Sequence, residues 1–126
     1  MSLNSPLSKV IGLGSEKKGV DHWWSQRVTA VAIAILGIWL LASSAMLGDF
    51  SYKNVMFWFK QPLNTFLLIL TILSVARHSH LGVESIFEDY IHNKMTKTIL
   101  LVANVLLHAC LAALGVFSTF ALFIGV

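Results

Sequence analysis

The chain has 126 residues, of which 56% are hydrophobic and only 12% are charged, and its mean hydropathy is +0.76. Soluble domains are about 25% charged, so this composition indicates a small membrane protein without room for a nucleotide-binding or hydrolytic domain. The net charge of +3 comes from scattered basic residues. Such residues are typical of loops that orient membrane helices, and we expect no nucleic-acid partner. The single cysteine, Cys110, excludes a disulfide or a cysteine metal cluster within the chain.

Residues 1–27 are expected to form a cytoplasmic N-terminal arm with an interfacial segment. The first part is polar and carries glycines up to Gly19, which predicts that no long helix forms there. Trp23 and Trp24 then mark the membrane interface, where indole rings concentrate, and Arg27 stands at the threshold of the first span. The arm lacks an apolar run of signal-peptide length, so we expect no cleavable signal.

Three apolar stretches follow, at residues 28–47, 63–86 and 99–126. The first is about 20 residues long, which gives roughly 30 Å as a helix and matches the hydrocarbon thickness of a bilayer. Pro62 suits the first turn of the second helix, and residues 48–61 are interpreted as a connector with an aromatic belt. The predicted fold class is therefore an all-α membrane protein, with a three-helix transmembrane anchor domain over residues 28–126.

The distribution of basic residues predicts the orientation of the spans. Only Lys53 and Lys60 lie between the first and second spans, whereas the other lysines and arginines lie before the first span or near and beyond the end of the second. Because positive charge concentrates on the inner side, the N-terminus is expected inside and the C-terminus outside. We expect a multi-pass protein of the bacterial cytoplasmic (inner) membrane rather than the mitochondrial inner membrane.

Ionisable residues gather at one end of the second span, from Arg77 to Tyr90, in the segment RHSHLGVESIFEDY. An arginine at the centre of a membrane helix costs about 2.5–3.5 kcal/mol on insertion scales, and ionisable groups there usually serve a function. We expect these residues to bind a cofactor, transfer a proton or contact a partner subunit.

Two histidines in this segment point in different directions. His78 and His80 are roughly 200° apart around a helix, so one cofactor cannot easily use both. His78 shares its face with Ser74 and Gly82, which are small enough to leave a flat wall for a porphyrin. His80 shares its face with Glu84 four residues on, a spacing that favours a paired structural role.

Haem iron accepts neutral imidazole as an axial ligand, and two histidines produce a low-spin electron-transfer centre. His78 is the best candidate ligand by this geometry. His80, and His108 within the third span, remain alternatives, and each lone histidine could instead bond a neighbouring helix. We expect the second axial ligand to come from a partner subunit.

The spacing of His78, Gly82 and the pair Asp89-Tyr90 resembles the small hydrophobic membrane-anchor subunit of succinate dehydrogenase (respiratory complex II). The run HWWSQRVTA, which starts at His22, is similar to the entrance of the first span in that subunit from alphaproteobacteria and mitochondria. The resemblance covers nearly the whole chain from about Gly12 and agrees with three spans.

This resemblance implies a four-subunit enzyme of the respiratory chain and tricarboxylic acid cycle. A flavoprotein subunit oxidises succinate, an iron–sulfur subunit relays electrons, and two anchors embedded in membrane lipid bind haem b and ubiquinone. His78 would bind the haem iron opposite a histidine of the larger cytochrome b anchor subunit. Tyr90 would donate a hydrogen bond to ubiquinone beside Asp89, and Arg27 and His22 would lie near the haem propionates. The chain would have no catalytic activity alone.

Two other functions are compatible with the same residues. A small proton or solute transporter subunit would use Arg77, His80 and Glu84 as a relay and would act without partners. A structural or assembly scaffold without haem would use its histidines only for packing.

Overall fold

The computed structural model describes residues 16–126, with side chains described from Gly19 onward. The described residues contain no strand and form four helices: α2 (Glu16–Ala45), α3 (Tyr52–Phe59), α4 (Pro62–Tyr90) and α5 (Lys94–Ile124). The helices α2, α4 and α5 are each long and apolar enough to cross a membrane. The predicted class, an all-α membrane protein with three spans, is confirmed.

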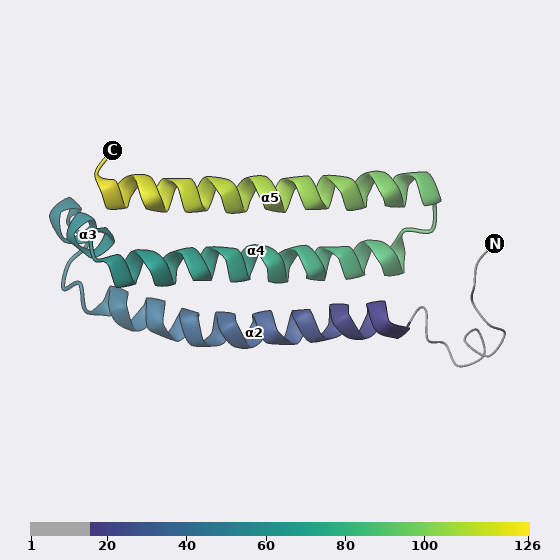
Figure 1. The fold of residues 1–126 in the computed structure, drawn as a ribbon, viewed down its shortest axis with the longest axis horizontal. Helices are drawn as coiled ribbons and strands as arrows, with labels where there is room; N and C mark the ends of the chain where they lie inside the picture. Colours follow the sequence, from purple (N-terminus) through teal and green to yellow (C-terminus); the bar gives the residue numbers. More distant parts are fainter. Residues whose placement is uncertain (1–15) are drawn as a thin grey trace.

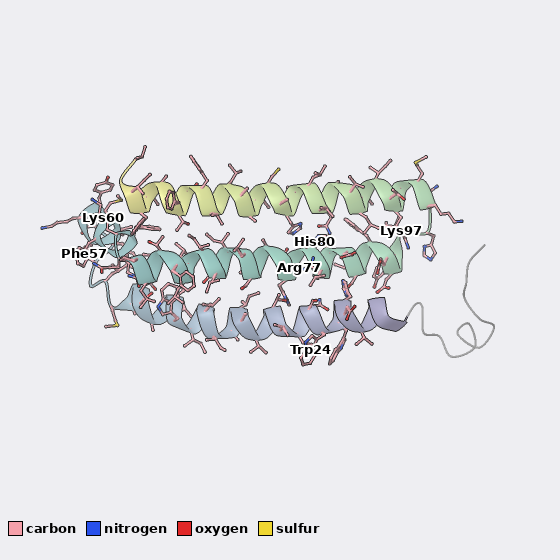
Figure 2. All side chains as sticks on the ribbon, in the orientation of Figure 1. Trp24, Phe57, Lys60, Arg77, His80 and Lys97 are labelled. Atoms are coloured by element: carbon pink, nitrogen blue, oxygen red, sulfur yellow. The ribbon has the colours of Figure 1, made fainter. Side chains whose placement is uncertain are left out.

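The three long helices lie side by side in one row, with α4 in the middle (Figure 1). Both α2 and α5 pack against α4 and do not contact each other, and α3 packs across α4 and α5. Phe57 and Lys60 lie at the α3 end of the row, Lys97 lies at the opposite end, and Arg77 and His80 lie between them (Figure 2). In the part of the chain that the structure describes, Leu81 is the one buried hydrophobic side chain. A single layer of helices has no closed core, so both of its faces remain open for lipid or other subunits.

Local signals explain where the helices begin and end. Pro62 occupies the first turn of α4, where its missing N–H costs nothing. Asn93 caps α5, because its side-chain oxygen accepts hydrogen bonds from the backbone N–H groups of Met95 and Thr96 at 3.0 and 3.1 Å. Gly125 ends α5 with a positive φ of 83°, which glycine adopts without a steric penalty.

One expectation about local structure was wrong, and one short helix was not expected. Gly19 lies inside α2, which begins at Glu16, because one glycine costs a helix only about 1 kcal/mol and cannot stop a helix that continues into the membrane. The connector contains a short helix, α3, which is too short for its sequence period to show and is held by packing on α4 and α5. The expected N-terminal arm up to residue 15 lies outside the described residues.

The helices α4 and α5 approach each other closely at Gly115. A Cβ atom added there would lie only 2.9 Å from Cγ2 of Ile72. Small residues at membrane helix contacts allow backbones to approach in this way.

Candidate functional site

His78 lies on the face of α4 that meets α2 and is half-buried. Its Nδ1 atom lies 3.1 Å from Oγ1 of Thr29. The same hydroxyl oxygen lies 2.9 Å from the carbonyl oxygen of Ser25 and 3.1 Å from that of Gln26. Carbonyl oxygens only accept hydrogen bonds, so with the hydroxyl proton on α2 the hydroxyl oxygen accepts from Nδ1–H in the tautomer that carries its proton there. This tautomer leaves the lone pair of Nε2 free.

His80 faces α5, with Nδ1 hydrogen-bonded to that helix and Nε2 near a carboxylate of its own helix. The Nδ2 group of Asn104 donates to Nδ1 of His80 at 3.0 Å and to its backbone carbonyl oxygen at 3.0 Å. The Nε2 atom lies 3.6 Å from Oε2 of Glu84. The expected pairing of His80 with Glu84 is present, and Asn104, which is only 4% exposed, is an unexpected second partner.

His108 is also paired on both sides of its ring. Nδ1–H donates to the carbonyl oxygen of Asn104 at 2.9 Å, and Nε2 accepts from the hydroxyl group of Ser79 at 3.0 Å. The rings of His80 and His108 have centroids 5.7 Å apart. These groups join α4 to α5 through a continuous set of hydrogen bonds.

Among the described residues, His78 is therefore the one histidine of these three with a ring nitrogen that neither makes a hydrogen bond nor lies beside a carboxylate. No group of three or more His, Cys, Asp or Glu side chains capable of holding a metal occurs in the described part of the chain. A metal bound by the described residues at His78 would take one ligand from this chain and the others from elsewhere, as the iron of a haem does.

The surroundings of His78 differ from the open wall expected from the sequence. A Cβ added to Gly82 would lie 3.9 Å from the side-chain nitrogen of Gln26, so α2 covers part of the wall beside the histidine. Thr29 lies on the same helix, α2. Close packing of α2 on α4 brings the hydroxyl group of Thr29 to the ring of His78.

His22 and Arg27 lie on different faces of α2. His22 is seven residues before Thr29, almost in line with it, and its Nε2 atom lies 3.6 Å from Oε2 of Glu84. Arg27 is about 200° from Thr29 around the helix and is exposed, with its guanidinium carbon 5.4 Å from the ring centroid of Trp23. The structure brings His22 beside the polar groups of α4 and leaves Arg27 on an open face.

Asp89 and Tyr90 end α4 and are both exposed. Asp89 shares the face of His78, about 16 Å further along the helix, and Tyr90 points about 120° away from His78. Tyr90 is 76% exposed, and its hydroxyl group has no hydrogen-bond partner within residues 19–126. The phenol is thus available to a ligand at this end of the row.

Arg77 is exposed and lines a groove of about 270 Å³ between α4 and α5. His80 and His108 line the same groove, but their polar contacts are made to Asn104, Glu84 and Ser79. Sequence reasoning missed Thr29, Asn104 and Ser79, although a polar side chain in a membrane span is a signal in itself.

The family model described as succinate dehydrogenase/fumarate reductase transmembrane subunit matches residues 1–123. The chain belongs to this family. It is 32% identical over 97 residues to a protein of Rickettsia bellii named succinate dehydrogenase hydrophobic membrane anchor subunit, covering 75% of this chain and 77% of the relative. A Reclinomonas americana protein named succinate dehydrogenase membrane anchor subunit is 34% identical over 86 residues, covering 66% and 72%. A Paracoccus denitrificans relative is 24% identical over 109 residues, covering 86% and 84%.

The family confirms the resemblance read from His78, Gly82 and Asp89-Tyr90. It also confirms the role of a membrane anchor subunit of an oxidoreductase complex, in a multi-pass membrane protein. An anchor subunit works within a larger assembly, and the open single layer leaves helix faces that other subunits or lipid can cover.

Proposed function

We propose that the chain is the small membrane anchor of a succinate:ubiquinone oxidoreductase. It docks the iron–sulfur and flavoprotein subunits beside the larger cytochrome b anchor subunit, and helps to bind haem b and ubiquinone in the cytoplasmic membrane of a bacterium. The observation that carries the proposal is the free Nε2 of His78, beside two other histidines whose ring nitrogens all face partners.

His78 is proposed as one axial ligand of the haem iron, with the second from the larger anchor. When bound, the haem supplies one-electron transfer. Arg27 is exposed on the open face of α2, where a guanidinium can form charge-assisted hydrogen bonds with a propionate. His22 is a second propionate candidate because its Nε2 atom is buried and has no hydrogen-bond partner among the described residues.

Tyr90 and Asp89 are proposed to line the ubiquinone pocket at the inner end of α4. The exposed phenol of Tyr90 can donate a hydrogen bond to a quinone carbonyl oxygen. Asp89 stands beside it as an exposed carboxylate. The charge distribution predicts that this end faces the cytoplasm, the side on which the iron–sulfur subunit would dock.

A reduced-minus-oxidised optical spectrum of the purified complex tests the ligand. We expect a b-type haem signal in the wild type, loss or change of the signal in His78→Ala, and retention in His108→Ala. An unchanged signal in His78→Ala would move the ligand to another histidine. A wild-type complex without haem would leave quinone binding or scaffolding as the role of this chain.

A further inference from the structure

Among the described residues, Thr29 is the side chain that lies within hydrogen-bond distance of the proposed haem ligand. Its Oγ1 atom lies 3.1 Å from Nδ1 of His78, although the two residues are on different helices. We infer that Thr29 is a positioning residue for the haem, which holds the ring of His78 in the tautomer and orientation that present Nε2 to the iron. This inference rests on the proposed function, because it requires His78 to be a ligand.

The direction of the hydrogen bonds supports this role. The hydroxyl of Thr29 lies 2.9 and 3.1 Å from the carbonyl oxygens of Ser25 and Gln26, and when it donates to them its oxygen is left to accept from Nδ1–H of His78. A metal-bound histidine typically donates its other N–H to a fixed acceptor, and this bond sets both the tautomer and the angle of the ring. The hydroxyl of Thr29 supplies such an acceptor at a half-buried contact between two helices.

Thr29 is also held in place by its own helix. The bond from its hydroxyl to the backbone one turn earlier restricts the χ1 angle, which is already limited in a β-branched side chain. The acceptor therefore does not move independently of α2. Haem binding is thereby coupled to the packing of α2 against α4.

The hydroxyl oxygen of Thr29 should also affect the reduction potential of the haem. Accepting from Nδ1–H increases electron density on the imidazole, and a more basic ligand stabilises the ferric haem relative to the ferrous haem. Removal of the acceptor should raise the reduction potential and weaken haem retention. Loss of such outer partners typically lowers metal affinity by about 10- to 100-fold.

The test uses the purified complex with Thr29→Val, which keeps the shape of the side chain and removes the hydroxyl. Thr29→Ser keeps the hydroxyl. Thr98→Val is a matched control, because Thr98 also bonds the carbonyl oxygen four residues before it, at 3.0 Å, in another helix. Thr29→Ala is a second hydroxyl-free variant for use if the valine variant does not assemble.

Three properties are measured: the haem content after dialysis against apomyoglobin, the electron paramagnetic resonance spectrum of the ferric haem, and the midpoint potential. The hydroxyl-free variants should lose haem about 10- to 100-fold more readily, with a changed ferric spectrum and a higher potential. The Thr29→Ser and Thr98→Val variants should behave like the wild type.

The outcomes separate this inference from the function on which it rests. Wild-type haem retention, spectrum and potential in Thr29→Val or Thr29→Ala, together with haem loss in His78→Ala, would overturn the role of Thr29 and leave the ligand in place. Absence of b-type haem from the wild-type complex would overturn both. Equal haem loss in Thr29→Ser and Thr29→Val would also overturn the role, because the hydroxyl would then not be the cause.

Discussion

Replacement of Gly115 by alanine tests how closely α4 and α5 are packed. The new Cβ atom would lie 2.9 Å from Cγ2 and 3.4 Å from Cδ1 of Ile72, whereas carbon atoms in favourable contact lie about 3.5–4.0 Å apart. Isoleucine in a helix has one strongly preferred χ1 rotamer, so the methyl group cannot turn away cheaply. The helices must separate by roughly half an ångström or more, and overpacking of this kind costs about 1–3 kcal/mol.

Denaturation of the purified complex in mixed detergent micelles, followed by circular dichroism, measures this cost. Gly115→Ala should lower stability by about 1–3 kcal/mol, whereas Gly37→Ala should not destabilise through a contact within this chain, because a Cβ at Gly37 meets no atom within 4 Å. Ile72→Ala removes the obstructing atoms and should abolish the penalty of Gly115→Ala. Wild-type stability of Gly115→Ala, or an equal penalty in the Ile72→Ala background, would refute the reasoning.

Other parts of the chain support further predictions. Asn104→Leu should lower stability by about 1–3 kcal/mol in the same assay, because two interhelical hydrogen bonds of about 0.6–2 kcal/mol each are lost; unchanged stability would contradict this. Tyr90→Phe should impair ubiquinone reduction while succinate oxidation by a soluble acceptor persists, and equal loss of both would argue against a quinone contact. Arg27→Leu should shift the haem potential or weaken haem retention, and unchanged values would remove this residue from the haem site. Hydrogen bonds from Ser51 lower the pKa of Asp49, so these bonds stabilise the loop while the carboxylate is charged. The loop should be ordered above the ordinary aspartate pKa of about 3.9 and should lose this order as the pH falls through the lowered pKa of Asp49. Amide exchange of Ser51, corrected for its intrinsic rate, should then increase in acid, and the increase should be absent in Asp49→Asn.

The fold was largely predictable because each long helix carries its own signal. An apolar run of membrane length needs no neighbour to become a helix, since every backbone group must be bonded within the segment. The short helix α3 was missed for the opposite reason. Its eight residues are stabilised by contacts with α4 and α5 that are distant in sequence.

The candidate site was predictable only in part. The angle between His78 and His80 around the helix correctly separated their environments, and the spacing of Glu84 correctly indicated a partner for His80. The pairing of His108 with Ser79 could not be predicted from the local sequence, because the two residues lie on different helices and are 29 positions apart.

Composition and hydropathy by themselves determined that this protein is a small three-span membrane protein, and the spacing of His78 and Asp89-Tyr90 indicated its family. The tertiary structure alone decided which ring nitrogens are occupied. Spacing along one helix sets the face on which a side chain lies, but the partner on that face depends on the neighbouring helix and on its rotation. Thr29, 49 positions from His78, reaches the histidine only because α2 packs against α4 with its hydroxyl-bearing face inward.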